Sequence, residues 1–440
     1  MRTVIRNGVV LTMDPSLGLV DPGTVVIEDD IIVEITAGDG SIDGDVVIDA
    51  TGHAVIPGLV NGHAHARPAR ALGDGLTLRE WHDRYPDNVV RRMQDEDAWL
   101  GAVAGCGELL LGGCTTVLAM PNFPTPFGAG CDDVGIRACV AAHATDIEAM
   151  ADSCDSLESN LAAVEANAPF ADARIQYWFG FEHQNAATDD LVVEMTRLAQ
   201  KYETGLTSHL CESAGDIERH VERHGARPVP RYDELGAIGP HAVYAHGNWL
   251  DADEIALFAE RDAALVHNPV SNMRMGTGIA DVPAWLEAGI RFALGTDGML
   301  SSYRLDMWEV IRATAMLARV TAKNPELLPS KQLLYLATQG GADALGLGDR
   351  IGSLTPGKQA DVAVIDLQRL HLAPRSHAPH DNLESLLAFC VGPEDVRHVL
   401  VAGNHVVADA ELTTVDERSI VDRLAGRIGP LSELFGAGVS

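Results

Sequence analysis

The sequence predicts an α/β fold, a (β/α)8 TIM barrel with a small β-sandwich domain built from both chain ends. Between residues 58 and 349, short apolar runs alternate with longer amphipathic stretches, which is the pattern of a closed parallel barrel with helices between its strands. Residues 1–57 and 350–440 are richer in short alternating strands and turns. We therefore expect the two ends to fold together as a β-sandwich domain beside a catalytic barrel of residues 58–349.

Composition limits the class of protein. A chain of 440 residues with 46% hydrophobic and 22% charged residues can bury a large core, as ordinary globular proteins do. The net charge of −31 argues against nucleic acid and anionic membranes as partners. No apolar run approaches the roughly 20 residues of a membrane span, and the first residues do not resemble a secretory signal, so we expect a cytoplasmic location. The seven cysteines include no CxxC pair and predict neither a disulfide framework nor a thiolate zinc site.

The elements follow in order along the chain. Short strands over residues 3–12, 24–28, 31–35 and 45–49 form the first β unit. The predicted barrel strands are Ala54–Val60, Thr115–Ala119, Ile175–Phe181, Leu206–Leu210, Ala242–Ala245, Ala264–His267 and Arg291–Gly295. The predicted barrel helices are Asp95–Leu111, Ser156–Ala168, Asp190–Tyr202, Ala252–Arg261 and Asp306–Val320. Strands at Ala360–Ile365 and His398–Val407, with a turn at Gly403–Asn404, precede a final helix over Asp416–Leu434.

Metal-binding side chains stand at the ends of four apolar strands. The first strand runs into His63-Ala64-His65, and residues i and i+2 of a strand point to one side, so both imidazoles can reach one ion. His209, His246 and Asp297 end later strands or directly follow them. Because active-site residues of such barrels come from the carboxyl ends of the strands, we expect these side chains to share one site.

The residue types indicate the metal. Three neutral imidazoles and one carboxylate leave a divalent complex with net positive charge, which lowers the pKa of a bound water toward about 7. Nitrogen and oxygen ligands of this kind suit Zn²⁺, with Fe²⁺ or Mn²⁺ as alternatives. A second ion would usually need a carboxylated lysine near the strand before His209. The run 175–183 has no lysine, so we expect one divalent ion per subunit, although Glu182 remains a possible bridge.

Several motifs together resemble one family. They are Pro57–His65, His209–Glu212, Val266–Asn272 with Gly276–Ala280, Leu294–Gly298 and the tail Ile351–Asp361. With these motifs, the chain resembles the amidohydrolase superfamily nearly end to end, in particular the S-adenosylhomocysteine/methylthioadenosine deaminase and chlorohydrolase branch. The resemblance implies that the metal ligands are His63, His65, His209 and Asp297.

The resemblance also implies the catalytic roles. Glu212 would protonate a ring nitrogen, His246 would orient the hydroxide or polarise the leaving centre, and Asp297 would accept the proton of the water. Trp81 and His183 match substrate-binding positions. The implied activity is that of a metal-dependent aminohydrolase, which deaminates an amino-substituted heterocycle (purine, pterin or triazine-like) by attack of metal-bound hydroxide and releases ammonia.

Departures from the family pattern leave the substrate open. Cys211-Glu212-Ser213 stands where relatives commonly have Ala-Glu-Thr, and the segments Met120–Pro124 and Gln184-Asn185 also differ. Alternatives are hydrolytic removal of chloride or an alkylamine from an s-triazine, and hydrolysis of a cyclic amide. A non-catalytic barrel scaffold is a further alternative, but such a protein would typically lose ligands that this chain keeps. The expected partner is a small heterocyclic substrate, and by analogy with relatives we expect a homo-oligomer.

Overall fold

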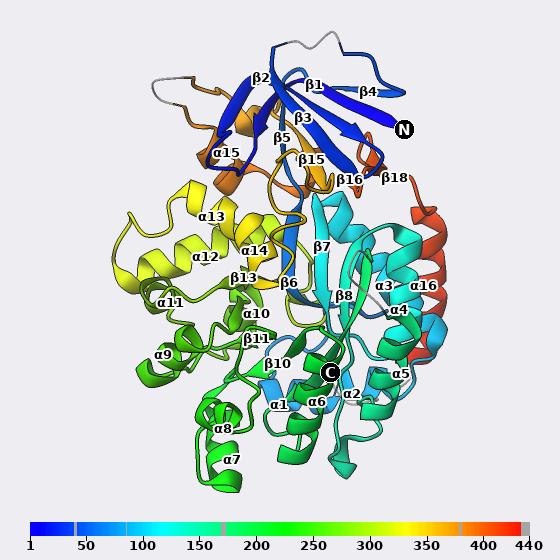
Figure 1. Cartoon of the computed structure of the whole chain (residues 1–440). Coiled ribbons are helices and arrows are strands. Elements are labelled where there is room, and N and C mark those ends of the chain that lie inside the picture. Colours follow the sequence, from blue (N-terminus) through cyan, green and yellow to red (C-terminus); the bar gives the residue numbers. More distant parts are fainter. Residues whose placement is uncertain (39–41, 85, 169–172, 378–380, 433–440) are drawn as a thin grey trace.

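A parallel barrel forms the body of the molecule in the computed structural model, which describes residues 1–38, 42–84, 86–168, 173–377 and 381–432 (Figure 1). Neighbouring strands follow the order β13-β12-β11-β10-β9-β8-β7-β6-β14. The strands are β6 (Leu59–His65), β7 (Cys114–Ala119), β8 (Arg137–Ala141), β9 (Ile175–His183), β10 (Leu206–Leu210), β11 (Ala242–His246), β12 (Ala264–His267), β13 (Phe292–Leu294) and β14 (Asp297–Gly298). β13 and β14 belong to one short stretch, and β14 pairs in parallel with β6, which closes the barrel as predicted.

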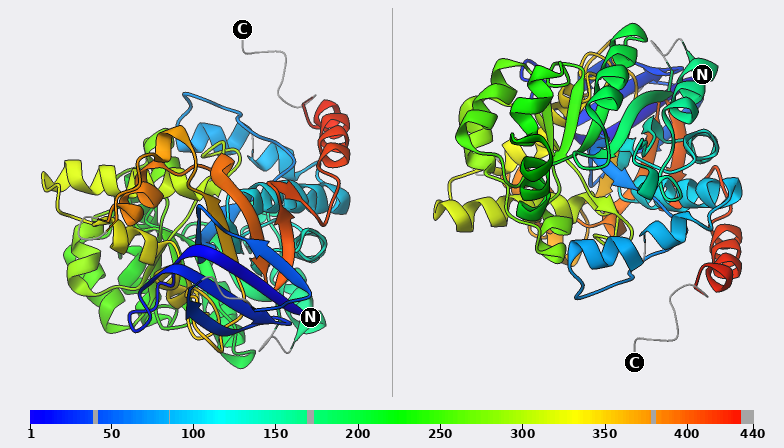
Figure 2. Two further views of the ribbon diagram at one scale, coloured as in Figure 1. Left: turned by 90° about the horizontal axis from the view of Figure 1, so that it is seen from above. Right: turned by 90° about the horizontal axis from the view of Figure 1, so that it is seen from below.

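Helices lie outside the strands, as Figure 2 shows from two further directions. They are α1 (Leu78–Arg84), α2 (Pro86–Val90), α3 (Asp95–Leu111), α4 (Pro124–Val134), α5 (Leu157–Asn167), α6 (Asp189–Lys201), α7 (Ala214–His224), α8 (Pro228–Glu234), α9 (Ala252–Glu260), α10 (Pro269–Met275), α11 (Val282–Ala288), α12 (Met307–Ala322), α13 (Ser330–Leu336) and α14 (Gln339–Ala344). Side-chain caps define several starts: Ser156, Thr188 and Ser213 each accept a backbone N–H in the first turn. None of the helices in the described ranges is both long and apolar enough to cross a membrane.

Both chain ends contribute to a second, mixed sheet, the predicted β-sandwich part. Its strands are β1 (Arg2–Leu11), β2 (Leu19–Glu28), β3 (Ile31–Ala37), β4 (Val46–Asp49), β5 (His53–Pro57), β15 (Val362–Asp366), β16 (Val396–Val401), β17 (Asn404–Ala408) and β18 (Glu411–Leu412). The two ends meet where β5 pairs antiparallel with β15. Successive side chains of β15 point to opposite faces and contribute to two cores. Val362 and Val364 join the small apolar cluster of this sheet, while Ala363 and Ile365 join the large cluster of the barrel.

One predicted strand is wrong. The run Ala54–Val60 is not a single strand but two, β5 in the mixed sheet and β6 in the barrel, separated by Gly58. Gly58 is crowded by Thr115, whose Oγ1 atom would lie 2.1 Å from a Cβ at this position. The chain therefore changes sheets at a residue that only glycine can occupy without displacing its neighbour.

The last helix, α16 (Glu417–Ser432), lies beside α3 rather than beside the mixed sheet (Figure 1). Ile420 joins the barrel's apolar cluster, and Arg427 forms a bidentate ion pair with the buried Asp97 of α3, at 2.6 Å for both contacts. The predicted helix extended to Leu434, and its last two residues lie outside the described residues. The domain boundaries at 57/58 and 349/350 stay a prediction.

Candidate metal centre

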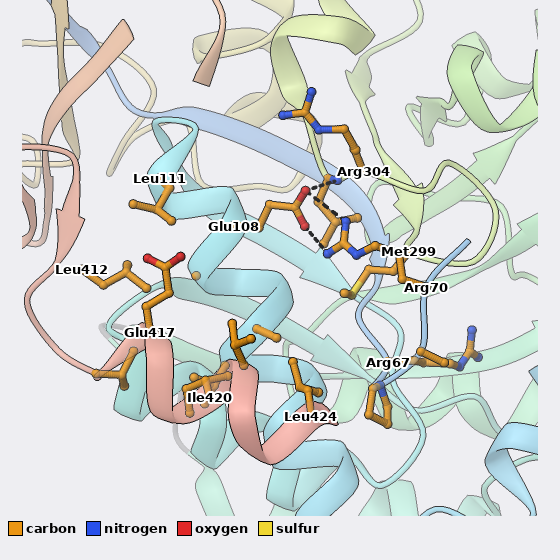
Figure 3. A pocket seen from close by; sticks show the side chains of 18 of the residues that line it. Arg67, Arg70, Glu108, Leu111, Met299, Arg304, Leu412, Glu417, Ile420 and Leu424 are labelled. Atoms are coloured by element: carbon orange, nitrogen blue, oxygen red, sulfur yellow. Dashed lines mark hydrogen bonds and ion pairs between the residues drawn. The ribbon is translucent and has the colours of Figure 1, made fainter. Parts of the chain in front are cut away.

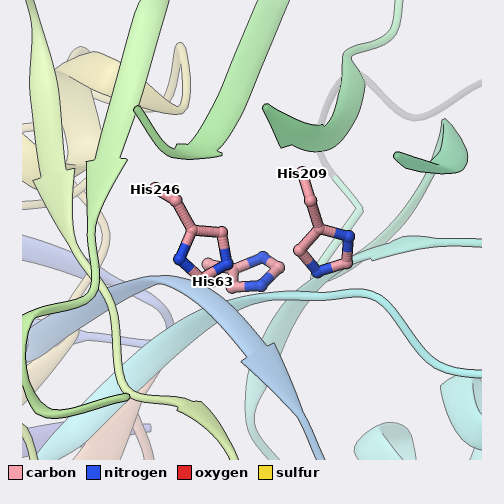
Figure 4. Close-up of side chains that lie close together, drawn as sticks. All are labelled: His63, His209 and His246. Carbon is pink, nitrogen blue, oxygen red and sulfur yellow. The ribbon is translucent and has the colours of Figure 1, made fainter. Parts of the chain in front are cut away.

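The carboxyl ends of the barrel strands bring the predicted metal-binding side chains together. His63 and His65 lie on β6, His209 on β10, His246 at the end of β11 and Asp297 on β14. The ligand atoms form two overlapping groups, His63 with His209 and His246, and His63 with His65 and Asp297, and within each group all atoms lie within 4.8 Å of one another. Figure 4 shows the first group, whose three rings gather from separate elements around one point. All five side chains are buried.

The backbone turns sharply at these strand ends. Cys211, His246 and Asp297 adopt left-handed conformations with φ of 51°, 76° and 61°. Such a conformation is unfavourable for a residue with a side chain, and it concentrates at functional sites where the surrounding structure imposes it. Cys211 directly follows β10, His246 ends β11 and Asp297 begins β14, so each of these turns lies next to a side chain of the site.

Two imidazoles meet with unprotonated nitrogens. His65 Nδ1 lies 2.8 Å from the carbonyl oxygen of Met120, and His209 Nδ1 contacts the carbonyl oxygen of Glu182. A carbonyl only accepts hydrogen bonds, so both Nδ1 atoms carry the proton and both Nε2 atoms carry a lone pair. The two Nε2 atoms lie 3.0 Å apart. Lone pairs at this distance repel each other unless a cation lies between them, so the arrangement fits a metal ion.

His63 and Asp297 complete the same arrangement. His63 is fully buried, and neither of its ring nitrogens has a hydrogen-bond partner among the described residues. Asp297 Oδ1 lies 3.8 Å from His63 Nε2 and 3.5 Å from His65 Nε2. Zinc bonds of ~2.0–2.1 Å in a tetrahedral site place ligand atoms about 3.3 Å apart. The observed spacings are close to this value, so the orphaned imidazole and the carboxylate suit one shared ion.

Burial keeps these groups in ligand form. It lowers the pKa of His63 well below its usual value, and the neighbouring imidazoles of His65 and His209 lower it further. Burial and His143 act in the same way on the pKa of His65. Burial alone would raise the pKa of Asp297, but His246, His63 and a hydrogen bond from Ser271 lower it below its usual value. The site therefore offers neutral imidazoles and an ionised carboxylate at neutral pH.

Glu212 is an acid of the opposite kind. It follows β10 by two residues, and its Oε2 lies 3.8 Å from His246 Nε2. Burial, reinforced by repulsion from Asp297, raises the pKa of Glu212 well above its usual value. Burial lowers the pKa of His246, whose Nδ1 donates to Asn272 Oδ1 at 2.9 Å. The raised pKa favours the protonated form of Glu212 beside the imidazole cluster.

The two residues predicted to bind substrate occupy different settings. His183 ends β9 next to Glu182, and its Nδ1 accepts the backbone N–H of Asn185 at 3.0 Å, so it belongs to the strand-end rim. Trp81 lies on α1 and is 5% exposed, with its indole N–H donated to the carbonyl of Leu72 at 3.1 Å. The Trp81 ring therefore belongs to the core in this structure, and its contact with a substrate stays a prediction.

Part of this centre was not predicted from the sequence. His143, two residues beyond β8, contacts His65, and its Nδ1 donates a hydrogen bond to the carboxylate of Glu182, which was considered only as a metal bridge. Asn272 and Ser271 at the start of α10 bind His246 and Asp297. The strand-end rule would have identified His143, but β8 itself was not among the predicted strands.

A cavity of about 690 Å³ opens elsewhere, between α3, α16 and the segment after β6 (Figure 3). Apolar side chains of α3 and α16 form much of its wall, and Arg70 pairs with Glu108 at one side. None of the strand-end imidazoles or carboxylates lines it. The chemistry of the centre therefore belongs to the barrel mouth and not to this cavity.

Comparisons with known proteins agree with the fold and the centre. The sequence profile of the Amidohydrolase family matches residues 54–406. The chain is 32% identical over 421 residues to 5'-deoxyadenosine deaminase of Methanosarcina mazei, which covers 95% of this chain and 96% of that protein. It is 31% identical over 436 residues to 5-methylthioadenosine/S-adenosylhomocysteine deaminase of Desulforamulus reducens, with 98% and 99% covered.

Solved structures give the same picture. An adenosine deaminase of Xanthomonas campestris with bound zinc matches with a TM-score of 0.91 at 28% identity, over 98% of each chain. Atrazine chlorohydrolase of Arthrobacter aurescens, complexed with zinc, matches with a TM-score of 0.84 at 23% identity, over 99% of this chain and 100% of that one, and shows the fold alone. The resemblance seen in the motifs is thus confirmed, and this protein belongs to the amidohydrolase family of metal-dependent hydrolases.

Proposed function

We propose that the protein is an aminohydrolase that removes the amino group of an aminated heterocycle, in the first place an adenine nucleoside, and releases ammonia. One observation carries the proposal: Glu212, an acid whose pKa is raised by burial, stands beside a cluster of imidazole nitrogens and a carboxylate that suit a single cation. An acid and a metal centre at one barrel mouth can protonate a ring nitrogen and supply hydroxide to the adjacent carbon.

The ion in this proposal is one divalent metal, zinc before Fe²⁺ or Mn²⁺, held by His63, His65, His209 and Asp297. When bound, it lowers the pKa of water so that hydroxide is available at neutral pH. The zinc in the Xanthomonas campestris structure supports this choice. The carboxylate of Glu182 is engaged by His143, which supports a single ion rather than a bridged pair.

The side chains then divide the proton transfers. Glu212 donates its proton to the ring nitrogen next to the reacting carbon, which prevents negative charge from accumulating on the ring. Asp297 is ionised and accepts the proton of the attacking water. His246 has its Nδ1 proton held by Asn272, so its Nε2 is an acceptor that can orient the water. The proton taken by Asp297 passes to the amino group, which leaves as ammonia. The remaining hydroxyl proton of the adduct returns to Glu212 as the carbonyl forms, which restores the acid.

Adenine nucleosides come first because the relatives named above carry deaminase names and cover nearly the whole chain. Loss of chloride or an alkylamine from a triazine would use the same hydroxide, but it is supported by likeness of fold only. Candidate contacts for the substrate are His183 at the rim and Trp81 on α1. A homo-oligomer stays a prediction.

A combined metal and turnover measurement tests the proposal. Metal analysis of the purified protein should give about one zinc per chain, and removal of the metal should abolish ammonia release until zinc is restored. The substrate panel comprises 5'-deoxyadenosine, 5'-methylthioadenosine, adenosine, guanine, a pterin, an aminotriazine and a chlorotriazine. Ammonia from a nucleoside supports the proposal, whereas chloride release without any ammonia would support the alternative hydrolase. A protein that takes up no transition metal would contradict both and favour the scaffold.

A further inference from the structure

Two further buried side chains lie next to the imidazole cluster. The proposed reaction does not use either of them. His143 follows β8 and Glu182 lies at the end of β9, and each is 4% exposed. His143 Nδ1 donates a hydrogen bond to the Glu182 carboxylate, and His143 Nε2 lies 3.1 Å from His65 Nδ1. A buried carboxylate and imidazole that are this close to a metal centre can act on its ligands.

The direction of each hydrogen bond follows from its acceptors. The carboxylate of Glu182 only accepts, so His143 Nδ1 carries the proton and His143 Nε2 is an acceptor. His65 Nδ1 must donate, because the Met120 carbonyl also contacts it at 2.8 Å. The His65 proton is therefore shared between Met120 and His143. A continuous chain runs from the Glu182 carboxylate through two imidazoles to the lone pair of His65 Nε2.

Glu182 also acts on the second imidazole, through its main chain. Its carbonyl oxygen accepts the Nδ1 proton of His209. The same residue thus fixes the proton of His209 directly and that of His65 through His143. Since the two Nε2 atoms lie 3.0 Å apart with lone pairs facing, Glu182 holds both imidazoles in the form that binds a cation.

We propose that His143 and Glu182 are positioning residues, which orient His65 and His209 and raise the affinity of the centre for its metal. The carboxylate contributes negative charge to the chain and makes His65 a stronger donor to the ion, while His143 fixes the ring angle. This inference rests on the proposed function, because it assumes that the centre holds a metal.

Three variants separate this role from a purely structural one. H143L keeps the approximate size but removes both hydrogen bonds. H143Q restores one acceptor and one donor on the same side chain. E182Q removes the carboxylate charge but leaves the main-chain carbonyl for His209. Two variants outside the cluster are the matched controls. H220Q changes a buried histidine whose Nδ1 contacts the carbonyl oxygen of Ala226, and E254Q changes a buried carboxylate that pairs with Arg227.

The main measurement is the Kd of each apo-protein for Zn²⁺, determined by competition with a chelator. The absorption spectrum of the Co²⁺ form and the unfolding temperature of each apo-protein are also recorded. We expect H143L and E182Q to bind Zn²⁺ about 10- to 100-fold more weakly, as loss of such outer partners typically does. H143Q should fall between H143L and the parent protein. The Co²⁺ spectrum should change in H143L, and the apo unfolding temperature should fall no further than in the controls.

Zn²⁺ affinity within twofold of the parent in both H143L and E182Q would overturn the inference, as would an H143Q that binds no better than H143L. If H143L does not fold, H143Q and E182Q decide the question. Absence of metal binding by the parent protein would instead refute the proposed function, so the two failures can be told apart.

Discussion

At the scale of single residues, the centre separates two carboxyl groups by their surroundings. Asp297 is surrounded by His246 and His63 and receives a hydrogen bond from Ser271, which together outweigh its burial and lower its pKa. No comparable donor among the described residues contacts the Glu212 carboxyl, and burial and the charge of Asp297 raise its pKa. Two carboxyl groups with pKa values displaced in opposite directions are suited to act as base and acid in one reaction.

The role of Glu212 can be tested by a substitution that replaces its acidic hydroxyl group with an amide nitrogen. E212Q keeps the size of the side chain but removes the acidic proton, so we expect metal content to stay unchanged and kcat to fall by about two to four decades. Ammonia release and metal analysis on the same preparation check this. The control E218Q alters an exposed carboxylate on α7 and should leave kcat unchanged. Full turnover in E212Q would contradict the assignment.

His267 at the end of β12 makes stability depend on pH. Burial, with a smaller contribution from His246, lowers its pKa from 6.5 to about 3. Between these values the unfolded chain binds a proton that the folded chain does not. The contribution of His267 to stability is therefore fully present above pH 6.5 and is lost as the pH falls toward 3. At pH 5 the loss amounts to about 2 kcal/mol.

The variant H267Q removes this titration. Urea unfolding of the apo-protein at pH 7 and pH 5 should show a smaller loss of stability in H267Q than in the parent, by about 2 kcal/mol. Other groups titrate equally in both proteins, so their contributions cancel in the comparison. Equal losses in the two proteins would show that His267 is not the group responsible.

At the scale of elements, the sequence predicted the helices and strands whose local pattern of apolar and polar residues agrees with their place in the fold. The bounds of α3, β10 and β12 match the predicted ranges, because each combines a clear apolar pattern with polar or glycine-containing boundaries. β8 was missed, and with it His143. It follows α4, whose sequence contains two prolines and two glycines and so hides the alternation of helix and strand.

The site shows the same limit. Strand-end reasoning located His63, His65, His209, His246 and Asp297, because each stands at the end of an apolar run. Contacts between distant segments could not be predicted from the sequence pattern, since no spacing rule relates position 143 to position 182. The run Ala54–Val60 was predicted as one strand although the expected domain boundary falls within it, because its division at Gly58 depends on the close approach of Thr115, which a strand pattern does not reveal.

Gly295, between β13 and β14, offers a test at this scale. A Cβ there would lie 2.2 Å from Asn268 Oδ1, 2.7 Å from Val266 Cγ1 and 3.2 Å from His63 Cβ. G295A should therefore destabilise the protein by about 1–3 kcal/mol and weaken Zn²⁺ binding, because the strand that carries Asp297 must shift away from His63. Thermal unfolding and metal competition measure both effects.

Gly426 in α16 provides the matched control. Apart from its own helix backbone and chain neighbours, no atom of the described residues lies within 4 Å of the position where its Cβ would stand, and the residue is exposed within a helix. G426A should stabilise the protein by about 0.5–1 kcal/mol, since alanine loses less backbone entropy in a helix. A G295A protein as stable and as tight for Zn²⁺ as the parent would show that the close approach of β13 to His63 is not required.

At the scale of the whole molecule, one buried carboxylate fastens the mixed sheet to the barrel. Asp361, just before β15, binds the guanidinium of Arg137 on β8 through two contacts of 2.9 Å. It also accepts the backbone N–H of Ala402 at 2.8 Å, and its carbonyl accepts the N–H of Gly58. The start of the first barrel strand, β8 and the hairpin of β16 and β17 therefore meet at this residue.

Removing that carboxylate should destabilise the whole chain. D361N leaves Arg137, whose side chain is 3% exposed, as a buried cation without a counter-charge, a change that typically costs about 3–5 kcal/mol. The double variant R137M/D361N removes the buried charge as well and should recover most of the loss. E194Q, which breaks the exposed pair with Arg197, should change stability by less than about 1 kcal/mol. Urea unfolding of the three proteins measures these differences. If D361N lost no more stability than E194Q, the ion pair would not be what joins the chain ends to the barrel.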